Sequence, residues 1–250
     1  MVHYPRARNR IIRPMTEPNW SEVFGIYGGS FDPPHLGHLE AATAVIEDLK
    51  IRKLIIVPSG RPPLKLAGTD KELRLEMVRS CFSSTKISAA RIEIDTREIE
   101  RESANPSYTF DTIQEMKQEF HSPLAFIIGS DQLLDLNKWH RFQDLLKLCH
   151  WIVLKRKPIP ETQVSRVLEQ LAASGILRGS SDHQFGAYQI TGSSTHLRVI
   201  ETPAPELSSS QIRAEIQRRG EIPRNVVTEK VADLIRKNGL YGMKRPQYDD

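Results

Sequence analysis

The chain alternates two hydrophobic patterns along most of its length. Short apolar, β-branched runs predict buried strands at 23–27, 53–57, 86–95, 124–128, 150–154 and 197–201. Between them apolar residues recur every three or four positions, which predicts helices at 39–49, 109–120, 139–149, 162–174, 209–219 and 226–238. A further helix is predicted by the apolar stripe of Leu73, Met77 and Cys81. We therefore expect a doubly wound, Rossmann-like α/β fold: a parallel sheet with helices on both faces, C-terminal helices, and ligands at the carboxyl ends of the strands.

Several residues mark where the helices begin and end. The run from Thr69 to Glu72 fits a capping box, and Gly239 is placed to end the last helix. Ser107 or Thr109 is placed to cap the helix at 109–120. The segment 175–195 is rich in Gly and Ser with little periodicity, so we interpret 158–200 as an insertion-like part of one domain over 21–242. A lid, an oligomer contact and an inert insertion all remain open for it.

Composition narrows the class of protein. At 250 residues the chain is long enough to bury a full core. No apolar stretch reaches the ~18 residues of a spanning helix, and residues 1–20 lack a secretory signal, so we expect a cytoplasmic protein without a membrane partner. Cys81 and Cys149 lie in helical windows and are expected to be core residues in a reducing compartment.

The charge is concentrated at the N-terminus. The net charge is +4, and residues 1–20 carry four arginines against Glu17, which accounts for +3 of it. The rest of the chain is nearly neutral, so no nucleic-acid partner is expected. The segment 1–20 has no apolar periodicity, and we predict a disordered arm there and a short tail at 243–250.

The most informative motif follows the first predicted strand. Residues 28–38 read Gly-Gly-Ser-Phe-Asp-Pro-Pro-His-Leu-Gly-His. A strand, a Gly-rich turn and a helix start direct backbone N–H groups and the positive end of a helix dipole at a phosphate. His35 and His38 fall on one face of that helix start, and Gly37 lets phosphates approach the backbone. Neither a P-loop nor a dinucleotide-binding fingerprint occurs.

Three further segments are candidates for the same site, although each alone also fits an ordinary cap or turn. The run Ser-Tyr-Thr-Phe-Asp-Thr at 107–112 opens a helix, which puts Tyr108 near its free N–H groups. Gly129 ends a strand, where a ribose or base could lie close to the backbone. The segment 207–213 offers hydroxyls at a helix start, and Arg213 one turn later is a forked phosphate donor.

In combination these motifs resemble the nicotinate-mononucleotide adenylyltransferases, which belong to the nucleotidyltransferase superfamily with a His-x-Gly-His motif. The resemblance runs from about 24 to 242 and includes the Asn-Gly-Leu-Tyr run at 238–241. It implies direct in-line transfer of the adenylyl group of ATP to nicotinate mononucleotide, which gives deamido-NAD and pyrophosphate. The resemblance implies catalytic roles for His35, His38 and Arg213. It implies ATP contacts by Gly28, Gly29, Ser30, Gly37, Gly129, Asp131, Ser209 and Ser210. It implies contacts to the pyridine mononucleotide by Lys65, Tyr108, Thr109 and Trp139.

Three departures from the family pattern stand near the expected site. Residues 208–210 read Ser-Ser-Ser where the family usually has Ser-Ser-Thr, which keeps a hydroxyl. Leu64 replaces a His of a Pro-Pro-His-Lys run, which removes a polar group just before Lys65. Ser59 replaces an Asn that is common after the second strand.

The expected partners are ATP and nicotinate mononucleotide, and a homo-oligomer is possible. No clustered carboxylates have metal-ligand spacing, so Mg²⁺ is expected to be held by phosphates and water, with no dedicated protein ligands. The alternative acceptors are nicotinamide mononucleotide and phosphopantetheine. The run at 107–112 argues against phosphopantetheine. A non-catalytic nucleotide-binding regulator is a remote alternative, because both histidines and Arg213 are retained.

Overall fold

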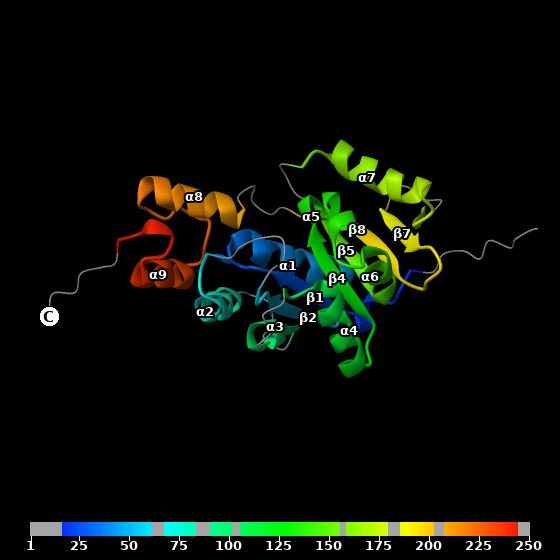
Figure 1. Cartoon of the computed structure of the whole chain (residues 1–250), viewed down its shortest axis with the longest axis horizontal. Helices are drawn as coiled ribbons and strands as arrows, with labels where there is room; N and C mark the ends of the chain where they lie inside the picture. The colour runs from blue at the N-terminus through cyan, green and yellow to red at the C-terminus, as the bar shows by residue number, and fades with distance from the viewer. Residues whose placement is uncertain are drawn as a thin grey trace, which may run out of the picture.

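The computed structural model describes residues 17–61, 68–83, 91–101, 106–155, 159–179, 186–202 and 208–244. Their centre is an eight-stranded sheet of order β3-β2-β1-β4-β5-β8-β7-β6 (Figure 1). The parallel strands are β1 (Phe24–Gly29), β2 (Lys53–Pro58), β3 (Ile92–Ile94), β4 (Leu124–Gly129), β5 (His150–Lys155) and β8 (His196–Glu201). The winding direction reverses between β1 and β4, and such a switch point opens a crevice at the carboxyl ends of the strands.

Helices cover both faces of the sheet, which confirms the predicted doubly wound fold. One face carries α1 (Leu36–Leu49), α2 (Lys71–Phe82), α8 (Ser209–Arg219) and α9 (Glu229–Asn238). The other carries α4 (Thr109–Glu119), α6 (Phe142–Leu148) and α7 (Glu161–Ala173). Side chains of β4 alternate between the two cores: Ala125 and Ile127 face the first, Phe126 and Ile128 the second. The remaining short elements are α3 (Arg97–Glu100), α5 (Ser130–Leu134), η1 (Trp20–Glu22), η3 (Leu136–Lys138) and η5 (Leu240–Gly242).

The sheet is mostly parallel, and it also has two antiparallel strands that were not predicted. β6 (Leu177–Gly179) and β7 (Ala187–Ile190) add antiparallel strands beside β8. Only Leu177 of β6 is buried, and strands this short show no alternation that could be recognised in the sequence. With α7, these strands make the described part of 158–200 an extension of the sheet.

Helix boundaries differ from the predictions where backbone conformation intervenes. Asp70, not Thr69, caps α2, and its carboxylate accepts the N–H groups of the two residues at helix positions two and three. Arg141 has a left-handed φ of 53°, so α6 begins after it rather than at 139. α9 begins after its cap Thr228, and Gly239 ends it as predicted, with φ of 61°. Residues 86–90, the first part of the strand predicted at 86–95, lie outside the described residues.

Both cysteines lie in the cores, as predicted. Cys81 and Cys149 are buried, and burial raises the pKa of each thiol to about 12. In the part of the chain that the structure describes, no helix is both long and apolar enough to cross a membrane.

The N-terminal boundary of the packed body lies earlier than predicted. Trp20 is only 9% exposed, belongs to the first core and makes an edge contact with His150 at 5.8 Å. Glu17 accepts the Trp20 indole N–H at 3.2 Å and pairs with Arg198 at 2.8 Å. The predicted arm at 1–20 is therefore wrong for residues 17–20, and residues 1–16 lie outside the described part.

Truncation distinguishes the two parts of the predicted arm. We expect deletion of residues 1–20 to lower the melting temperature by several degrees, because loss of a buried Trp costs about 3 kcal/mol or more. Deletion of residues 1–16 is expected to leave it unchanged. Thermal unfolding followed by circular dichroism compares the two, and equal melting temperatures would contradict the packing of Trp20.

Two stacked histidines, His196 buried and His150 half-buried, predict an acid-sensitive fold. The ring of His150 stacks on His196 at 5.7 Å, and its Nδ1 accepts the His196 N–H at 3.1 Å. Burial, and to a smaller extent His196, lowers the pKa of His150 to about 4. Burial lowers the pKa of His196 as well, against the opposing effects of the Ser194 backbone and Glu17. A histidine with a depressed pKa stabilises the fold above its unfolded pKa of ~6.5, and this contribution is lost as pH falls toward 4.

We expect the free energy of unfolding to fall by about 2 kcal/mol more between pH 7 and pH 5 in the wild type than in His150→Asn. The Asn carboxamide oxygen keeps the acceptor for His196 but does not titrate. Urea unfolding at both pH values measures the difference, and equal losses in the two proteins would rule out the histidine as its source.

Candidate active site

The turn between β1 and α1 carries the two predicted histidines. His35 is the N-cap of α1 and is 2% exposed, and His38 lies in the first turn of the helix. Their rings lie 3.8 Å apart. The main-chain N–H of His35 donates to Nδ1 of His38 at 3.1 Å. A neutral His38 therefore carries its proton on Nε2, which makes that atom a hydrogen-bond donor.

The start of α8 lies against the same turn. Ser208 caps this helix by accepting the N–H of Gln211. The hydroxyl of Ser209 donates to the carbonyl of Pro33 at 2.9 Å. Arg213 donates to the carbonyl of Asp32 at 2.6 Å through Nη1. These bonds bring a helix N-terminus, hydroxyls and a guanidinium beside the histidine pair, a combination that binds anions.

Asp32 anchors the turn from the other side. It is 1% exposed, and its carboxylate accepts the Tyr241 hydroxyl at 2.6 Å and the Gly68 N–H at 3.1 Å. Burial, and then the neighbouring Asp32, raises the pKa of Tyr241 well above its usual range. The Asn-Gly-Leu-Tyr run near the C-terminus thus contacts the turn that carries the histidines.

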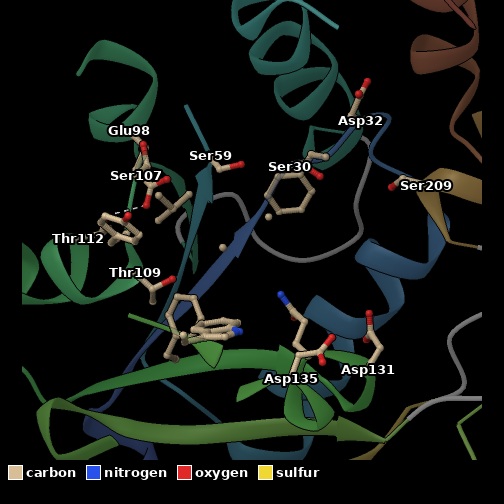
Figure 2. A pocket seen from close by; sticks show the side chains of 18 of the residues that line it. Ser30, Asp32, Ser59, Glu98, Ser107, Thr109, Thr112, Asp131, Asp135 and Ser209 are labelled. Carbon is tan, nitrogen blue, oxygen red and sulfur yellow. Dashed lines mark hydrogen bonds between the residues drawn. The ribbon is translucent and has the colours of Figure 1, made fainter. Parts of the chain in front are cut away.

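A cavity of about 720 Å³ opens beside this turn, at the carboxyl ends of β1, β2 and β4 (Figure 2). This volume lies within the usual range of small-molecule sites. At one end lie the histidine pair and the start of α8, and at the other the start of α4. Ser30 and Ser59 lie between the two ends. The cavity can therefore hold an elongated, phosphate-rich ligand.

The far end of the cavity has an aromatic wall beside a helix start. The ring of Tyr108 stacks on His140 at 4.5 Å, and Trp139 packs edge-on against Phe126 at 6.0 Å. Tyr108 is the N-cap of α4 and makes no side-chain cap. The prediction that Ser107 or Thr109 caps this helix is therefore wrong. A flat apolar ring with one anionic group fits this combination.

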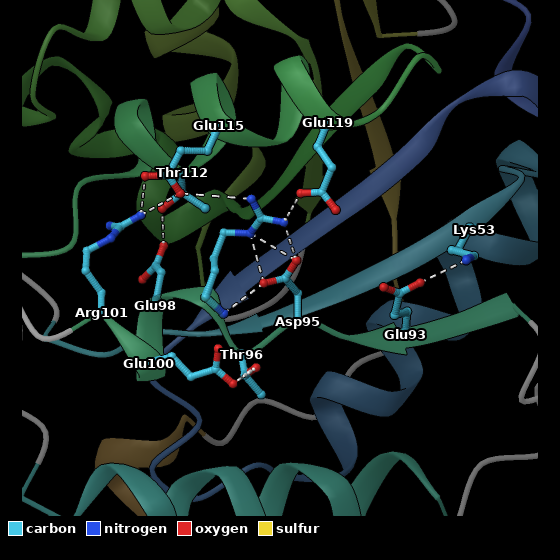
Figure 3. Close-up of polar contacts among 11 residues, drawn as sticks. Lys53, Glu93, Asp95, Thr96, Glu98, Glu100, Arg101, Thr112, Glu115 and Glu119 are labelled. Atoms are coloured by element: carbon cyan, nitrogen blue, oxygen red, sulfur yellow. Dashed lines mark hydrogen bonds and ion pairs between the residues drawn. The ribbon is translucent and has the colours of Figure 1, made fainter.

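Ion pairs hold α4 against α3 (Figure 3). The hydroxyl of Thr112 donates to the buried carboxylate of Glu98 at 2.6 Å. Burial raises the pKa of Glu98, and the hydrogen bonds from Thr112 and the Gly60 backbone oppose that rise. Arg101 pairs with Glu115 at 2.8 Å across the same two helices. The helix start at the cavity is therefore held by side chains behind it.

A second, smaller hollow of about 40 Å³ adjoins the first. Gly37 and Gly129 line it together with Tyr27 and Thr202, and His38 lines both spaces. The main-chain N–H of Gly129 donates to Gln132 at 3.0 Å. Among the described residues, no three His, Cys, Asp or Glu side chains gather as a metal site.

Comparison with known proteins identifies the family. Residues 26–215 match the cytidylyltransferase-like family model. A probable nicotinate-nucleotide adenylyltransferase of Moorella thermoacetica is 35% identical in an alignment of 232 positions that covers 90% of this chain and 93% of that one. Its counterpart in Yersinia pestis (strain Pestoides F) is 30% identical over 88% of this chain and 95% of its own. This chain is a member of the nicotinate-nucleotide adenylyltransferase family.

A solved structure supports the fold of this family member. The nicotinic acid mononucleotide adenylyltransferase of Plasmodium falciparum, complexed with NaAD, matches with a TM-score of 0.66 at 19% identity, over 89% of this chain and 98% of that one. The resemblance inferred from the motifs is thus confirmed at the level of family and fold.

The structure gathers most of the residues that the family resemblance implied. The main cavity is lined by His35, His38, Arg213, Gly28, Gly29, Ser30, Asp131, Ser209, Ser210, Tyr108, Thr109 and Trp139. Gly37 and Gly129 line the adjoining hollow instead. Lys65 lies outside the described residues.

Sequence reasoning missed several residues of the site. Asp32 stands inside the quoted motif but received no role, although it anchors the turn. Glu98 and Asp135 also line the cavity, and neither has a motif signal that a single sequence reveals. His140 could have been found, because it follows Trp139 directly and shares its loop.

Proposed function

We propose that this protein transfers the adenylyl group of ATP to nicotinate mononucleotide, forming deamido-NAD and pyrophosphate. One observation carries the proposal: a single cavity joins an anion-binding turn with two histidines to an aromatic wall at a helix N-terminus. The first end suits a triphosphate and the second a pyridine carboxylate. Membership of the family supports the same reaction.

The reaction needs positioning rather than a base. An oxygen of the mononucleotide phosphate, already ionised at pH 7, attacks the α-phosphorus of ATP. The bond from the α-phosphorus to the bridging oxygen breaks, and that electron pair leaves with pyrophosphate. Because no proton must be removed, the rate depends on alignment and on stabilising negative charge.

The side chains at the β1–α1 turn suit that demand. Nε2 of His38 is a donor for phosphate oxygens, and Arg213 with the start of α8 supplies positive potential for the departing pyrophosphate. The remaining roles of the cavity residues are those that the family resemblance implied, and we propose them for this chain.

The donor set of the cavity fits Mg²⁺ only as part of the nucleotide. The carboxylate of Asp32 already accepts two hydrogen bonds, and no three candidate ligands gather among the described residues. We propose that Mg²⁺ enters with ATP, bound by phosphate oxygens and water, as is common for this ion. ATP and nicotinate mononucleotide are the proposed partners. That the protein is located in the cytoplasm stays a prediction. So does the possibility of a homo-oligomer.

A turnover assay tests the proposal directly. The purified protein is given ATP and Mg²⁺ with nicotinate mononucleotide, nicotinamide mononucleotide or phosphopantetheine, and pyrophosphate release is measured. We expect fastest release with nicotinate mononucleotide. If pyrophosphate is released fastest with another acceptor, that acceptor is the substrate and the proposed one is wrong. If no acceptor gives pyrophosphate release, the proposed activity is wrong.

A further inference from the structure

A buried guanidinium lies beneath the floor of the cavity. Arg74 of α2 is 1% exposed. Its side chain donates to four main-chain carbonyls: Nη1 to Ser30 at 2.9 Å and to Ser59 at 2.7 Å, Nη2 to Gly60 at 3.0 Å, and Nε to Thr69 at 3.3 Å. Burial lowers the pKa of Arg74, and nearby acidic groups, Asp32 first among them, oppose that shift. Four of the five N–H donors of the side chain are thus bound to main-chain carbonyls, and Arg74 is not among the residues that line the cavity.

These carbonyls belong to the two strand ends that form the cavity floor. Register pairs Gly29 of β1 with Pro58 of β2, and one more backbone bond, from the Ser59 N–H to the Gly29 carbonyl at 2.8 Å, follows. Beyond that point, Arg74 bridges the Ser30 and Ser59 carbonyls with one nitrogen. The guanidinium therefore continues the connection between β1 and β2 beyond the last backbone hydrogen bond that joins them.

The bridged residues occupy the middle of the cavity. Figure 2 shows Ser30 and Ser59 between Asp32 and Ser209 on one side and Thr109 on the other. If the triphosphate and the pyridine ring take the two ends, the attacking phosphate and the α-phosphate meet above these strand ends. A shift of about 1 Å in such a site can cost ~10²-fold in rate.

We propose that Arg74 is a positioning residue for adenylyl transfer, which sets the separation of the β1 and β2 ends beneath the reacting phosphates. This inference rests on the proposed function. Arginine is required because its planar fork has fixed donors that reach several acceptors at once, whereas a lysine ammonium is a point charge.

The test keeps the charge and removes the fork. In Arg74→Lys we expect kcat to fall about 10–100-fold, while KM for ATP and for nicotinate mononucleotide changes by less than about threefold. The matched control is Arg91→Lys, because Arg91 also donates to a backbone carbonyl, that of Ile51, but at the amino end of β2. The control is expected to keep wild-type turnover. Rates are compared per folded molecule, well below the melting temperature of each variant.

A second variant moves the same strand end, including the Gly60 carbonyl that Arg74 binds, without replacing Arg74 itself. A Cβ at Gly60 would lie 1.9 Å from the carbonyl oxygen of Glu98, so Gly60→Ala must displace the turn after β2. We expect a similar loss in kcat. This variant decides the question if Arg74→Lys does not fold.

The outcomes separate the two proposals. A folded Arg74→Lys with kcat within threefold of the wild type overturns the positioning role, as does an unchanged kcat in Gly60→Ala. Equal losses in Arg74→Lys and Arg91→Lys overturn it as well, because they indicate a general loss of stability. A wild type that is inactive on all three acceptors overturns the proposed function instead.

Discussion

Replacing His38 by alanine is expected to lower kcat about 10²–10³-fold, the range for removing one preorganised donor to developing charge. The His35 N–H occupies Nδ1 of this ring, so the proton of the neutral imidazole sits on Nε2 at the cavity. Charge grows on the α-phosphate and on pyrophosphate only as the reaction proceeds. The loss should therefore appear in kcat, with little change in KM for nicotinate mononucleotide.

Two further variants separate donation from turn geometry. The side-chain oxygen of His38→Asn can accept the His35 N–H as Nδ1 does, but this variant has no donor at the Nε2 position. His38→Gln reaches the Nε2 position with an N–H group and leaves the His35 N–H unpaired. We expect kcat of His38→Asn to be as low as that of His38→Ala, and kcat of His38→Gln to be partly restored. The control is His121→Ala, because His121 is exposed, and its kcat is expected to equal that of the wild type. Full activity in His38→Asn, or a kcat of His38→Ala within threefold of the wild type, would contradict the assignment.

The sequence alone predicted the elements that have a long pattern. The apolar residues of β1, β2, β4, β5 and β8 are mostly buried. The order of these strands and of the helices between them predicted the winding of the sheet and the edge at which the site lies. The short strands β6 and β7 were missed because three or four residues with one or two buried positions have no readable period. Trp20 was predicted to lie in a disordered arm because the contacts that hold it involve residues distant in sequence. Its ring packs against His150, and Glu17, which accepts its indole N–H, pairs with Arg198.

The site followed the same rule. Motifs whose chemistry is local, such as the histidines of the β1–α1 turn and the hydroxyls of α8, were identified from their own neighbours. Arg74 and Asp32 act through backbone atoms and long-range partners, which no spacing in the sequence reveals. Tyr241 lies 209 residues from the Asp32 carboxylate that it contacts, and only the fold brings them together.

The proposed reaction requires a nearly neutral body to bind two polyanions. The cations and dipoles are local: the start of α8, Arg213 and the α1 turn at one end, the start of α4 at the other. The buried charge of Arg74 lies under the point between them. In the binding mode that we propose, negative charge is offset where the phosphates meet, and the rest of the surface needs no excess of positive charge.

The start of α4 also predicts substrate choice. The first N–H groups of an α-helix have no partner within the helix, and those of α4 open at the cavity beside the Thr109 hydroxyl. These donors suit the carboxylate of nicotinate, whereas the NH₂ of a carboxamide would face donors with nothing to accept it. We expect kcat/KM for nicotinate mononucleotide to exceed that for nicotinamide mononucleotide by at least ~100-fold, about 2.7 kcal/mol.

Thr109→Val should reduce this preference while leaving the affinity for ATP alone, because the shape stays and one donor is lost. Thr162→Val is a matched control, since Thr162 is exposed in the first turn of α7, outside the cavity lining. Steady-state kinetics with both mononucleotides measures the preference in all three proteins. Equal use of the two mononucleotides by the wild type would refute the carboxylate site without refuting adenylyl transfer, and an unchanged preference in Thr109→Val would leave the backbone N–H groups as its source.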